Sequence, residues 1–442
     1  MALSTVTPVK NYSFLLDGHW ISNGEAVEVR SPYNQEAIAT VVYATRKQAE
    51  AGIAAAVRAF ETTRRLPAYE RQRVLRSVSQ GLSERREEFA QVLAREAGKP
   101  IKAARTEVER AILTFQVAAE ESTRIYGEVL PMDIQPAATG RWAILRRFPL
   151  GAIAAITPFN YPLNLAAHKI APAIACGCTM VLKPAPQTPF TTLMLGELVQ
   201  QAGWPDGALN ILPLSNEAAA PLITDERIRL LTFTGSATVG WELKQQAGKK
   251  RVALELGGNA GVIIHGDADL AYAAERCVAG GFSYAGQSCI SVQRILVERP
   301  AIDKFLELLL AGVGKLNTGD PLDEHTDIGP MIREADAIRA LEWVEEAKAA
   351  GARLLCGGQR RASVMQPTVL TNTQPGMRVN CREVFAPVVT VEPYDDFGEA
   401  LRRVNDSPYG LQAGIFTRDT RLLFRAYDEL QVGGVIAGDI PR

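Results

Sequence analysis

Apolar strand-like runs alternate with amphipathic helical runs through the middle of the chain, and this alternation most restricts the folds open to it. The order expected from residue 151 onward is strand 151–156, helix 163–175, strand 179–183, helix 189–202, strand 209–212, strand 229–234, helix 237–246 and strand 251–256. Repeated strand–helix–strand units form a mostly parallel sheet with helices on its faces. Ligands of such sheets bind beyond the carboxyl ends of the strands. We therefore expect an α/β fold with its functional site at that edge.

Regular patterns flank this region on both sides. Before it, short strands are expected over 13–44, with turns at Asp17-Gly18 and Asn23-Gly24, and helices over 46–61, 69–97 and 102–125. After it, a second alternating run predicts strand 262–265, helix 270–280, strand 293–298, helix 301–313, helix 338–350 and strand 388–391. The early helices are expected to form a layer on a sheet. Arg105 and Arg110 could point toward a substrate anion, but a solvated helix face is the expectation for both.

Cys289 stands in a polar turn just before a strand. Gly286 lets the backbone bend, and the β-branched run from Ile290 to Ile295 predicts the strand. A lone cysteine is most often a small buried hydrophobe. Two other loops favour chemistry instead, because Glu255 ends a strand before paired glycines and Asn160 lies in a turn bracketed by prolines. A thiol, a carboxylate and an amide after three apolar strands are the nucleophile, general base and oxyanion donor of a covalent reaction at a carbonyl.

Six motifs, in this order, resemble those of the aldehyde dehydrogenase superfamily. They are Pro158 to Pro162, Lys183 to Ala185, Phe233 to Ser236, Leu254 to Asn259, Gly286 to Cys289 and Glu383 to Pro387. Each motif is short, but together they cover nearly the whole chain. The run from Phe159 to Leu165, with His168, resembles the branch of lactaldehyde dehydrogenases and non-phosphorylating glyceraldehyde-3-phosphate dehydrogenases.

The resemblance implies an aldehyde dehydrogenase-like fold, with two doubly wound parallel-sheet domains and a small β oligomerisation arm. Residues 1–131 and 149–256 would form the dinucleotide-binding domain, 132–148 the arm, and 257–436 the catalytic domain with the nucleophilic cysteine. Family members usually continue past the position of Arg442 with a strand that pairs with a neighbouring subunit. Residues 437–442 are therefore expected to begin a truncated C-terminal arm, and a homodimer or homotetramer is expected where the tail is present.

The resemblance also implies NAD(P)-dependent oxidation of a small aldehyde to its carboxylic acid. Cys289 would attack the aldehyde carbon to give a thiohemiacetal, and the Asn160 amide with the Cys289 backbone N–H would hold the oxyanion. Hydride transfer to the nicotinamide would leave a thioester, and Glu255 would activate the water that releases the acid. Apolar surroundings can raise a carboxyl pKa toward neutrality, as suits a general base. Lys169 matches a family lysine that relays protons to the base. The alternative is that Lys169 is an ordinary charged residue on the surface of a helix.

The cofactor residues do not include the usual G-x-G-x-x-G fingerprint after the first α/β strand. Thr234-Gly235-Ser236 opens a helix whose free N–H groups can receive a phosphate, although an ordinary serine N-cap explains the same residues. By resemblance this segment contacts the dinucleotide phosphates, Lys183 the adenosine ribose and Glu383 the nicotinamide ribose. The set expected around NAD or NADP is Ile156, Thr157, Pro158, Phe159, Lys183, Ala185, Pro186, Gln187, Thr234, Gly235, Ser236, Gly240, Leu256, Glu383 and Phe385.

Two positions depart from common patterns of the family. Many NAD-preferring members carry a glutamate where Pro186 stands, and its absence removes a charge that would repel a 2′-phosphate. Relatives that act on phosphorylated or phosphonate aldehydes often carry an arginine where Ser288 stands. Pro186 therefore leaves the choice between NAD and NADP open, and Ser288 favours a small neutral or hydroxylated aldehyde.

The net charge and the cysteines restrict partners and surroundings. A formal net charge of -1 gives no reason to expect nucleic acid or an anionic membrane surface as a partner. No apolar run approaches the roughly 20 residues of a membrane span, and Met1 to Thr7 lack the pattern of a signal peptide. The six cysteines form no C-x-x-C pair and the histidines are scattered, so we expect a cytoplasmic protein without disulfides or a bound metal.

Three other functions stay open at this point. A CoA-acylating aldehyde dehydrogenase would also form a thioester, but such relatives often lack the base at the position of Glu255. A cysteine hydrolase needs a histidine beside Cys289, and the sequence identifies none. The third is a catalytically impaired relative that binds a dinucleotide or has a structural role, which the chain end at Arg442 keeps open.

Overall fold

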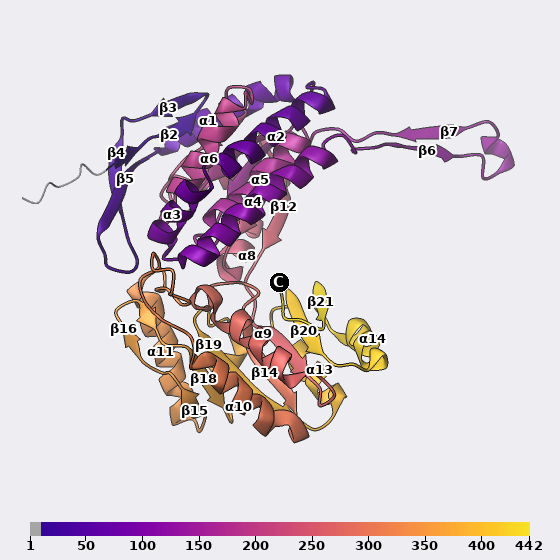
Figure 1. Cartoon of the computed structure of the whole chain (residues 1–442). Coiled ribbons are helices and arrows are strands. Elements are labelled where there is room, and N and C mark those ends of the chain that lie inside the picture. Colours follow the sequence, from indigo (N-terminus) through magenta and orange to yellow (C-terminus); the bar gives the residue numbers. More distant parts are fainter. Residues whose placement is uncertain (1–9) are drawn as a thin grey trace, which may run out of the picture.

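Two seven-stranded sheets, each covered by helices on both faces, organise the chain (Figure 1). The structure is a computed structural model that describes residues 10–442. Residues 1–9, which the sequence placed in the first domain and which include the segment searched for a signal peptide, lie outside the described residues. The two sheets confirm the predicted α/β class with two doubly wound domains.

The first sheet has the strand order β12-β11-β8-β9-β10-β2-β3. Its strands are β2 (Phe14–Leu16), β3 (His19–Ile21), β8 (Ala152–Ile156), β9 (Thr179–Lys183), β10 (Leu209–Ile211), β11 (Ile228–Thr234) and β12 (Arg251–Glu255). The strands from β12 to β10 pair in parallel, and β2 and β3 add an antiparallel edge. β8 and β9 are almost wholly buried because helices cover both faces.

Three layers of helices surround this sheet. The helices are α1 (Arg46–Thr63), α2 (Ala68–Glu84), α3 (Arg86–Ala97), α4 (Ile101–Glu121), α5 (Pro162–Ala175), α6 (Phe190–Gln201), α7 (Ala220–Thr224) and α8 (Ala237–Gln246). On one face α1, α7 and α8 contact the strands, and on the other α5 and α6 do, with α2, α3 and α4 packed over them. α7 was not predicted from the sequence.

The single helix predicted over 69–97 is wrong, because the chain divides it at Arg85. The backbone of Arg85 leaves the helical conformation, with φ -103° and ψ 20°. Its guanidinium donates to Glu88 at 2.8 Å and to Glu197 of α6 at 3.2 Å. A tertiary contact thus accompanies a break that the hydrophobic pattern does not reveal.

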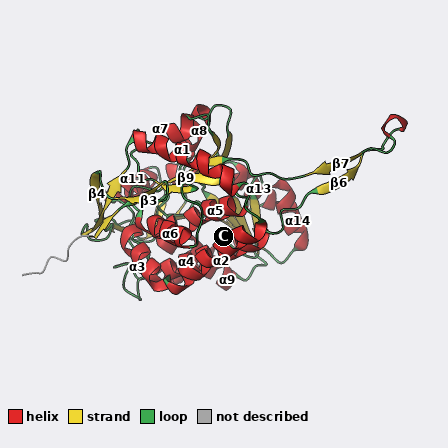
Figure 2. Cartoon of the chain, turned by 90° about the horizontal axis from the view of Figure 1, so that it is seen from above, coloured by secondary structure: helices red, strands yellow, loops and turns green. Residues whose placement is uncertain are grey.

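Two smaller β structures extend the first domain. β1 (Lys10–Tyr12), β4 (Glu25–Arg30) and β5 (Ala37–Tyr43) form a three-stranded sheet, and β6 (Glu128–Pro131) pairs antiparallel with β7 (Trp142–Leu145). The β6–β7 hairpin projects from the body of the molecule, as the two views in Figures 1 and 2 show. It starts at Glu128, before residue 132, where the arm was expected to begin. Its role in oligomerisation stays a prediction.

The second sheet has the strand order β15-β18-β19-β14-β13-β20-β21. Its strands are β13 (Ala260–Ile264), β14 (Val292–Glu298), β15 (Arg353–Cys356), β18 (Thr368–Thr371), β19 (Val388–Tyr394), β20 (Gln412–Phe416) and β21 (Gly434–Ala437), with the small hairpin of β16 (Arg360–Arg361) and β17 (Val364–Met365) beside them. Its helices are α9 (Leu270–Phe282), α10 (Ile302–Val313), α11 (Glu334–Ala349), α12 (Arg378–Cys381), α13 (Phe397–Asn405) and α14 (Thr420–Glu429). Val262 and Ile264 pack into one core and Ile263 into another, so both faces of the sheet are buried.

The last residues lie against the edge of this sheet. Asp439 forms a β-bridge with Ile415 and an ion pair with Arg276, and Ile440 is buried in the same core as Val262 and Ile264. Whether residues 437–442 begin an arm stays a prediction. Between residues 10 and 442 no helix combines the length and the apolar character needed to cross a bilayer.

Candidate active site

The four predicted catalytic residues line one cavity of about 940 Å³. Asn160 follows β8, Glu255 ends β12, Lys169 lies in α5, and Cys289 precedes β14 of the second sheet. The carboxyl ends of parallel strands meet at one edge of a sheet. The fold therefore collects at one place side chains from three distant stretches of the sequence, with Asn160 and Lys169 in the first, Glu255 in the second and Cys289 in the third.

The Cys289 thiol is half-buried after a 3₁₀ turn at Ser283–Gly286. Burial, followed by the negative charges of Glu383 and Glu255, raises the pKa of the Cys289 thiol to about 11. A thiol with this pKa is protonated at neutral pH, and only the thiolate attacks an electrophile. A base or a nearby cation is therefore needed to convert the Cys289 thiol to the thiolate.

The Asn160 side chain is buried and joins two loops. Its Nδ2 donates to the backbone carbonyl of Gln287 at 2.9 Å, two residues before Cys289. An amide nitrogen carries two hydrogens, so one N–H remains for a ligand in the cavity. The contact holds the Asn160 amide near Cys289 and leaves one of its N–H groups free.

The carboxylates of the site differ from the expectation in their burial. Glu255 is exposed at the end of the edge strand β12, so the apolar burial expected for this base is not found. The more buried carboxyl is that of the half-buried Glu383, which accepts the backbone N–H of Gly258 at 2.9 Å. Burial raises the pKa of Glu383 to about 7, with the Gly258 hydrogen bond and Arg339 opposing the rise.

Lys169 is buried, which rules out the helix-surface alternative. Its Nζ donates to Thr232 Oγ1 at 2.9 Å. Burial lowers the pKa of Lys169 to about 8, and the charge of Glu255 partly offsets this lowering. An ammonium with such a pKa can give up and regain a proton near neutral pH.

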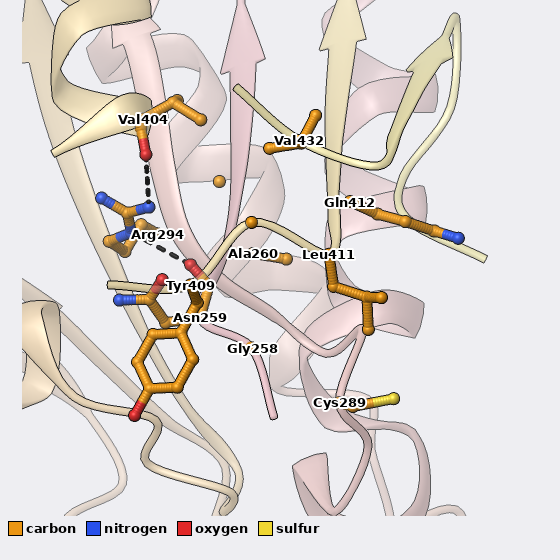
Figure 3. Close-up of a pocket in the computed structure, with 12 residues that line it drawn as sticks. Gly258, Asn259, Ala260, Cys289, Arg294, Val404, Tyr409, Leu411, Gln412 and Val432 are labelled. Carbon is orange, nitrogen blue, oxygen red and sulfur yellow. Dashed lines mark hydrogen bonds between the residues drawn. The ribbon is translucent and has the colours of Figure 1, made fainter. Parts of the chain in front are cut away.

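The paired glycines after Glu255 are required by close backbone approaches. A Cβ on Gly257 would lie 2.2 Å from Glu383 Oε2, and one on Gly258 would lie 2.3 Å from the carbonyl oxygen of Cys289. Figure 3 shows Gly258 close to the Cys289 loop, with the next residue, Asn259, held through its carbonyl by the Arg294 guanidinium at 3.0 Å. The link between the two sheets thus passes directly behind the nucleophile.

The predicted cofactor residues divide into two groups. The first group lines the same cavity as Cys289 and consists of Pro158, Phe159, Thr234, Gly235, Ser236, Leu256, Glu383 and Phe385. The second group does not line it and consists of Ile156, Thr157, Lys183, Ala185, Pro186, Gln187 and Gly240. Part of the second group still adjoins the first, because Ile156 pairs with Lys183 where β8 and β9 end.

Three features of these residues fit a bound dinucleotide. Lys183 is 5% exposed, and burial lowers the pKa of its ammonium to about 8. Thr157 Oγ1 is buried without a hydrogen-bond partner among residues 10–442. A Cβ on Gly240 would lie 2.3 Å from Leu256, so α8 can approach β12 only with glycine there. A phosphate or ribose could supply the partner that the Thr157 hydroxyl lacks, and α8 presents an N-terminus where Ser236 makes no side-chain cap.

Sequence reasoning missed several residues that line the cavity. Arg110 is exposed, as expected, and it also lines the cavity, with its guanidinium carbon 5.9 Å from the centre of the Tyr161 ring. Arg105 does lie on a solvated face, where it pairs with Glu87 and Glu324. Only the helical phase relative to α5 distinguishes the two arginines, and one sequence does not reveal that phase. Arg339, which also lines the cavity, comes from α11 without any motif.

This fold and site define a dinucleotide-dependent dehydrogenase with a cysteine nucleophile. Residues 20–441 match the profile of the Aldehyde dehydrogenase family. The chain is 43% identical over 438 residues to 3-sulfolactaldehyde dehydrogenase of Priestia aryabhattai, covering 99% of this chain and 91% of that protein.

Solved structures agree with this match. The chain is similar to aldehyde dehydrogenase 21 from Physcomitrella patens in complex with the reaction product succinate, with a TM-score of 0.97, 45% identity, and coverage of 98% and 91% of the two chains. It is also similar to a glyceraldehyde-3-phosphate dehydrogenase from Methanocaldococcus jannaschii complexed with NADP, with a TM-score of 0.91, 38% identity, and coverage of 95% and 91%. The chain belongs to the aldehyde dehydrogenase family, and it is an NAD(P)-dependent enzyme that oxidises a small aldehyde through a cysteine thioester.

Proposed function

We propose that Cys289 is the nucleophile, that Asn160 and the Cys289 backbone N–H bind the oxyanion, and that Glu255 is the general base, assisted by Lys169. The observation that carries this assignment is their shared cavity, which surrounds one space with a thiol, an amide, a carboxylate and an ammonium. Asn160 and Lys169 come from one segment of the chain, and Glu255 and Cys289 from two others. The arrangement supplies the groups that acyl chemistry at a carbonyl needs.

The steps follow from these groups. The Cys289 thiol loses its proton to the base, and the sulfur bonds to the aldehyde carbon while the carbonyl oxygen becomes an oxyanion. The free N–H of Asn160 stabilises that oxyanion, and losing one such donor typically costs about 3 kcal/mol in the barrier. When bound, the dinucleotide supplies the acceptor for the hydride of the substrate carbon. Glu255 passes the thiol proton to solvent and then takes a proton from water, whose oxygen attacks the thioester carbon. The carbon–sulfur bond breaks, which releases the acid and returns Cys289 as a thiolate.

The test is reduction of the nicotinamide, measured by absorbance, with a panel of small aldehydes and with NAD or NADP. Cys289→Ala should abolish turnover, because no other group of the cavity can form the thioester. Cys381→Ala, which removes another half-buried thiol outside the cavity, is the matched control and should keep full turnover. Turnover of Cys289→Ala at the wild-type rate would contradict the assignment of Cys289 as the nucleophile.

We further propose that the aldehyde carries an anionic group. Ser288 supplies no cation beside the nucleophile, but Arg110 reaches the same cavity from α4. The guanidinium presents a planar fork of donors suited to a carboxylate, sulfonate or phosphate. Two of the matched proteins are named for sulfolactaldehyde and glyceraldehyde-3-phosphate and a third is in complex with the product succinate, which all carry a negative charge, whereas others are named for uncharged lactaldehyde or cationic betaine aldehyde.

Arg110→Met tests the substrate class directly. We expect it to raise KM for succinic semialdehyde by roughly tenfold or more, because a charge-assisted hydrogen bond is lost. KM for uncharged butanal should not change. Arg105→Met removes a guanidinium from the same helix, outside the cavity, and is the matched control. Equal effects of Arg110→Met on both aldehydes would favour the neutral or hydroxylated substrate instead.

Three finer proposals complete the assignment. Pro186 is exposed and uncharged near Lys183, which supports acceptance of NADP as well as NAD. The exposed apolar side chains Ile134 and Trp142 of the β6–β7 hairpin, with 86% and 63% exposure, support a homodimer or homotetramer, which light scattering would test. All six cysteines are free, which supports a cytoplasmic location, and fluorescence imaging of the tagged protein would test it.

A further inference from the structure

The loop that carries Asn160 and the loop that carries Cys289 both lie outside the regular strands. Asn160 precedes α5 and Cys289 follows α9, and the Asn160–Gln287 hydrogen bond joins the two loops. A displacement of about 1 Å in such a site can cost roughly 100-fold in rate. The fold therefore needs something rigid behind both loops.

A buried ion pair lies behind the first loop. Lys99 precedes α4 and bonds Glu107 of that helix, and both side chains are 0% exposed. The second oxygen of Glu107 accepts the backbone N–H groups of Leu163 and Asn164, each at 3.1 Å. These are N–H groups of the first turn of α5, whose N-cap residue Tyr161 makes no side-chain cap. Glu107 thus caps from α4 the helix that starts immediately after Asn160.

The same ammonium lies against the second loop. Lys99 Nζ is 3.6 Å from the ring centre of Tyr161 and 4.5 Å from that of Tyr284. The two rings meet edge to face at 6.1 Å, and the Tyr284 hydroxyl donates to the carbonyl of Ala97 at 2.8 Å. Burial lowers the pKa of Lys99, and the Glu107 carboxylate opposes that lowering. The cation is stabilised by this carboxylate and by the two ring faces.

The turn that Tyr284 anchors is strained. Tyr284 and Ala285 have φ of 49° and 52°, a left-handed conformation that residues with a side chain seldom adopt. The strained turn leads through Gly286, Gln287 and Ser288 to Cys289. Such a backbone persists only where its surroundings hold it in several ways at once, and Tyr284, only 1% exposed, provides a buried anchor.

We infer that the buried Lys99–Glu107 pair, together with Tyr161 and Tyr284, is a positioning device that fixes the separation between the oxyanion donor Asn160 and the sulfur of Cys289. Lys99 and Glu107 are positioning residues, because they act on the reaction through the two loops and do not line the cavity. The inference rests on the proposed roles of Asn160 and Cys289.

The experiment uses the full chain and two substitutions that keep shape while removing charge, Lys99→Met and Glu107→Gln. We expect each to lower kcat by roughly tenfold or more, with KM for the dinucleotide within about twofold of the wild type. The double variant should be no slower than the slower single variant, since residues that act as one unit are not additive. Lys102→Met and Glu109→Gln remove charges from exposed pairs of the same helix and should leave kcat unchanged.

A second measurement does not depend on turnover. The rate at which iodoacetamide alkylates Cys289, followed by mass spectrometry, should change by about threefold or more in both variants, because the turn before the thiol moves. If the wild-type protein shows no turnover, the proposed function is refuted. An altered alkylation rate in the two variants would still support the positioning role.

Folded variants with wild-type kcat and wild-type alkylation rates would overturn the inference. If Lys99→Met and Glu107→Gln do not fold, Tyr284→Phe decides, because it removes only the hydroxyl that bonds Ala97. A kcat lowered by about threefold, with unchanged KM for the dinucleotide, then supports the positioning role. A kcat equal to that of the wild type then refutes it.

Discussion

Gly258→Ala should damage catalysis by moving the nucleophile. The new Cβ would lie 2.3 Å from the carbonyl oxygen of Cys289, whereas Cβ contacts shorter than 3.0 Å essentially do not occur. One of the two backbones must therefore move by at least 0.7 Å. The nearby atom belongs to the backbone and not to the flexible end of a side chain, so the strain cannot be relieved by a change of rotamer.

The size of the effect follows from that displacement. Since a misplacement of about 1 Å can cost roughly 100-fold in rate, we expect kcat to fall by roughly 10- to 100-fold, or about 1.4 to 2.7 kcal/mol in the barrier. Gly258 also donates its N–H to Glu383. A moved Gly258 backbone would weaken that bond and alter binding at the predicted nicotinamide ribose site, so KM for the dinucleotide should rise as well.

The assay is steady-state kinetics with a saturating aldehyde, together with thermal unfolding of each variant. Gly376→Ala is the matched control, because a Cβ there meets no atom within 4 Å, and its kcat should equal that of the wild type. A kcat for Gly258→Ala within about threefold of the wild type, in protein that unfolds at the wild-type temperature, would show that the Cys289 loop adapts and would refute the reasoning.

Three further predictions concern ionisation and the core. Because burial lowers the pKa of Lys183 to about 8 from its usual 10.5, the folded chain binds fewer protons than the unfolded chain between these pH values. The free energy of unfolding should therefore rise with pH across that window, and Lys183→Met should remove up to about 3 kcal/mol of that rise in urea titrations; an unchanged rise would exclude Lys183 as its source. The charge of Glu383 contributes to the raised pKa of Cys289, so Glu383→Gln should speed the alkylation of Cys289 by iodoacetamide at pH 8, and an equal or slower rate would argue against this coupling. Phe305→Ala empties a fully buried site and should cost about 3–5 kcal/mol in chemical denaturation, whereas Phe424→Ala, at a residue 69% exposed, should cost little; similar losses would contradict the assigned core.

Much of the fold could be predicted because its signals are local. The strand at Thr179–Lys183 and the helix at Ala237–Gln246 were predicted with their observed bounds, since each has a clear period and is bounded by polar or turn residues. The break at Arg85 could not be predicted, because the contact that accompanies it comes from Glu197, more than a hundred residues later. The same limit applies to Glu255, whose exposure depends on β12 being the edge strand of its sheet.

The candidate site shows the same division more sharply. The residue types of the chemistry and their positions at strand ends are local features, so Cys289, Glu255 and Asn160 could be recognised from motifs and strand patterns. The position of Arg110 rather than Arg105 at the cavity, the backbone contact that requires Gly258 and the ion pair behind the two loops all depend on packing between segments distant in sequence. Hydrophobic periodicity specifies which face of an element is buried, but not which partner covers that face. For this protein the residue types of the chemistry can be recognised in the sequence, whereas their positions relative to one another depend on contacts that exist only in the folded chain.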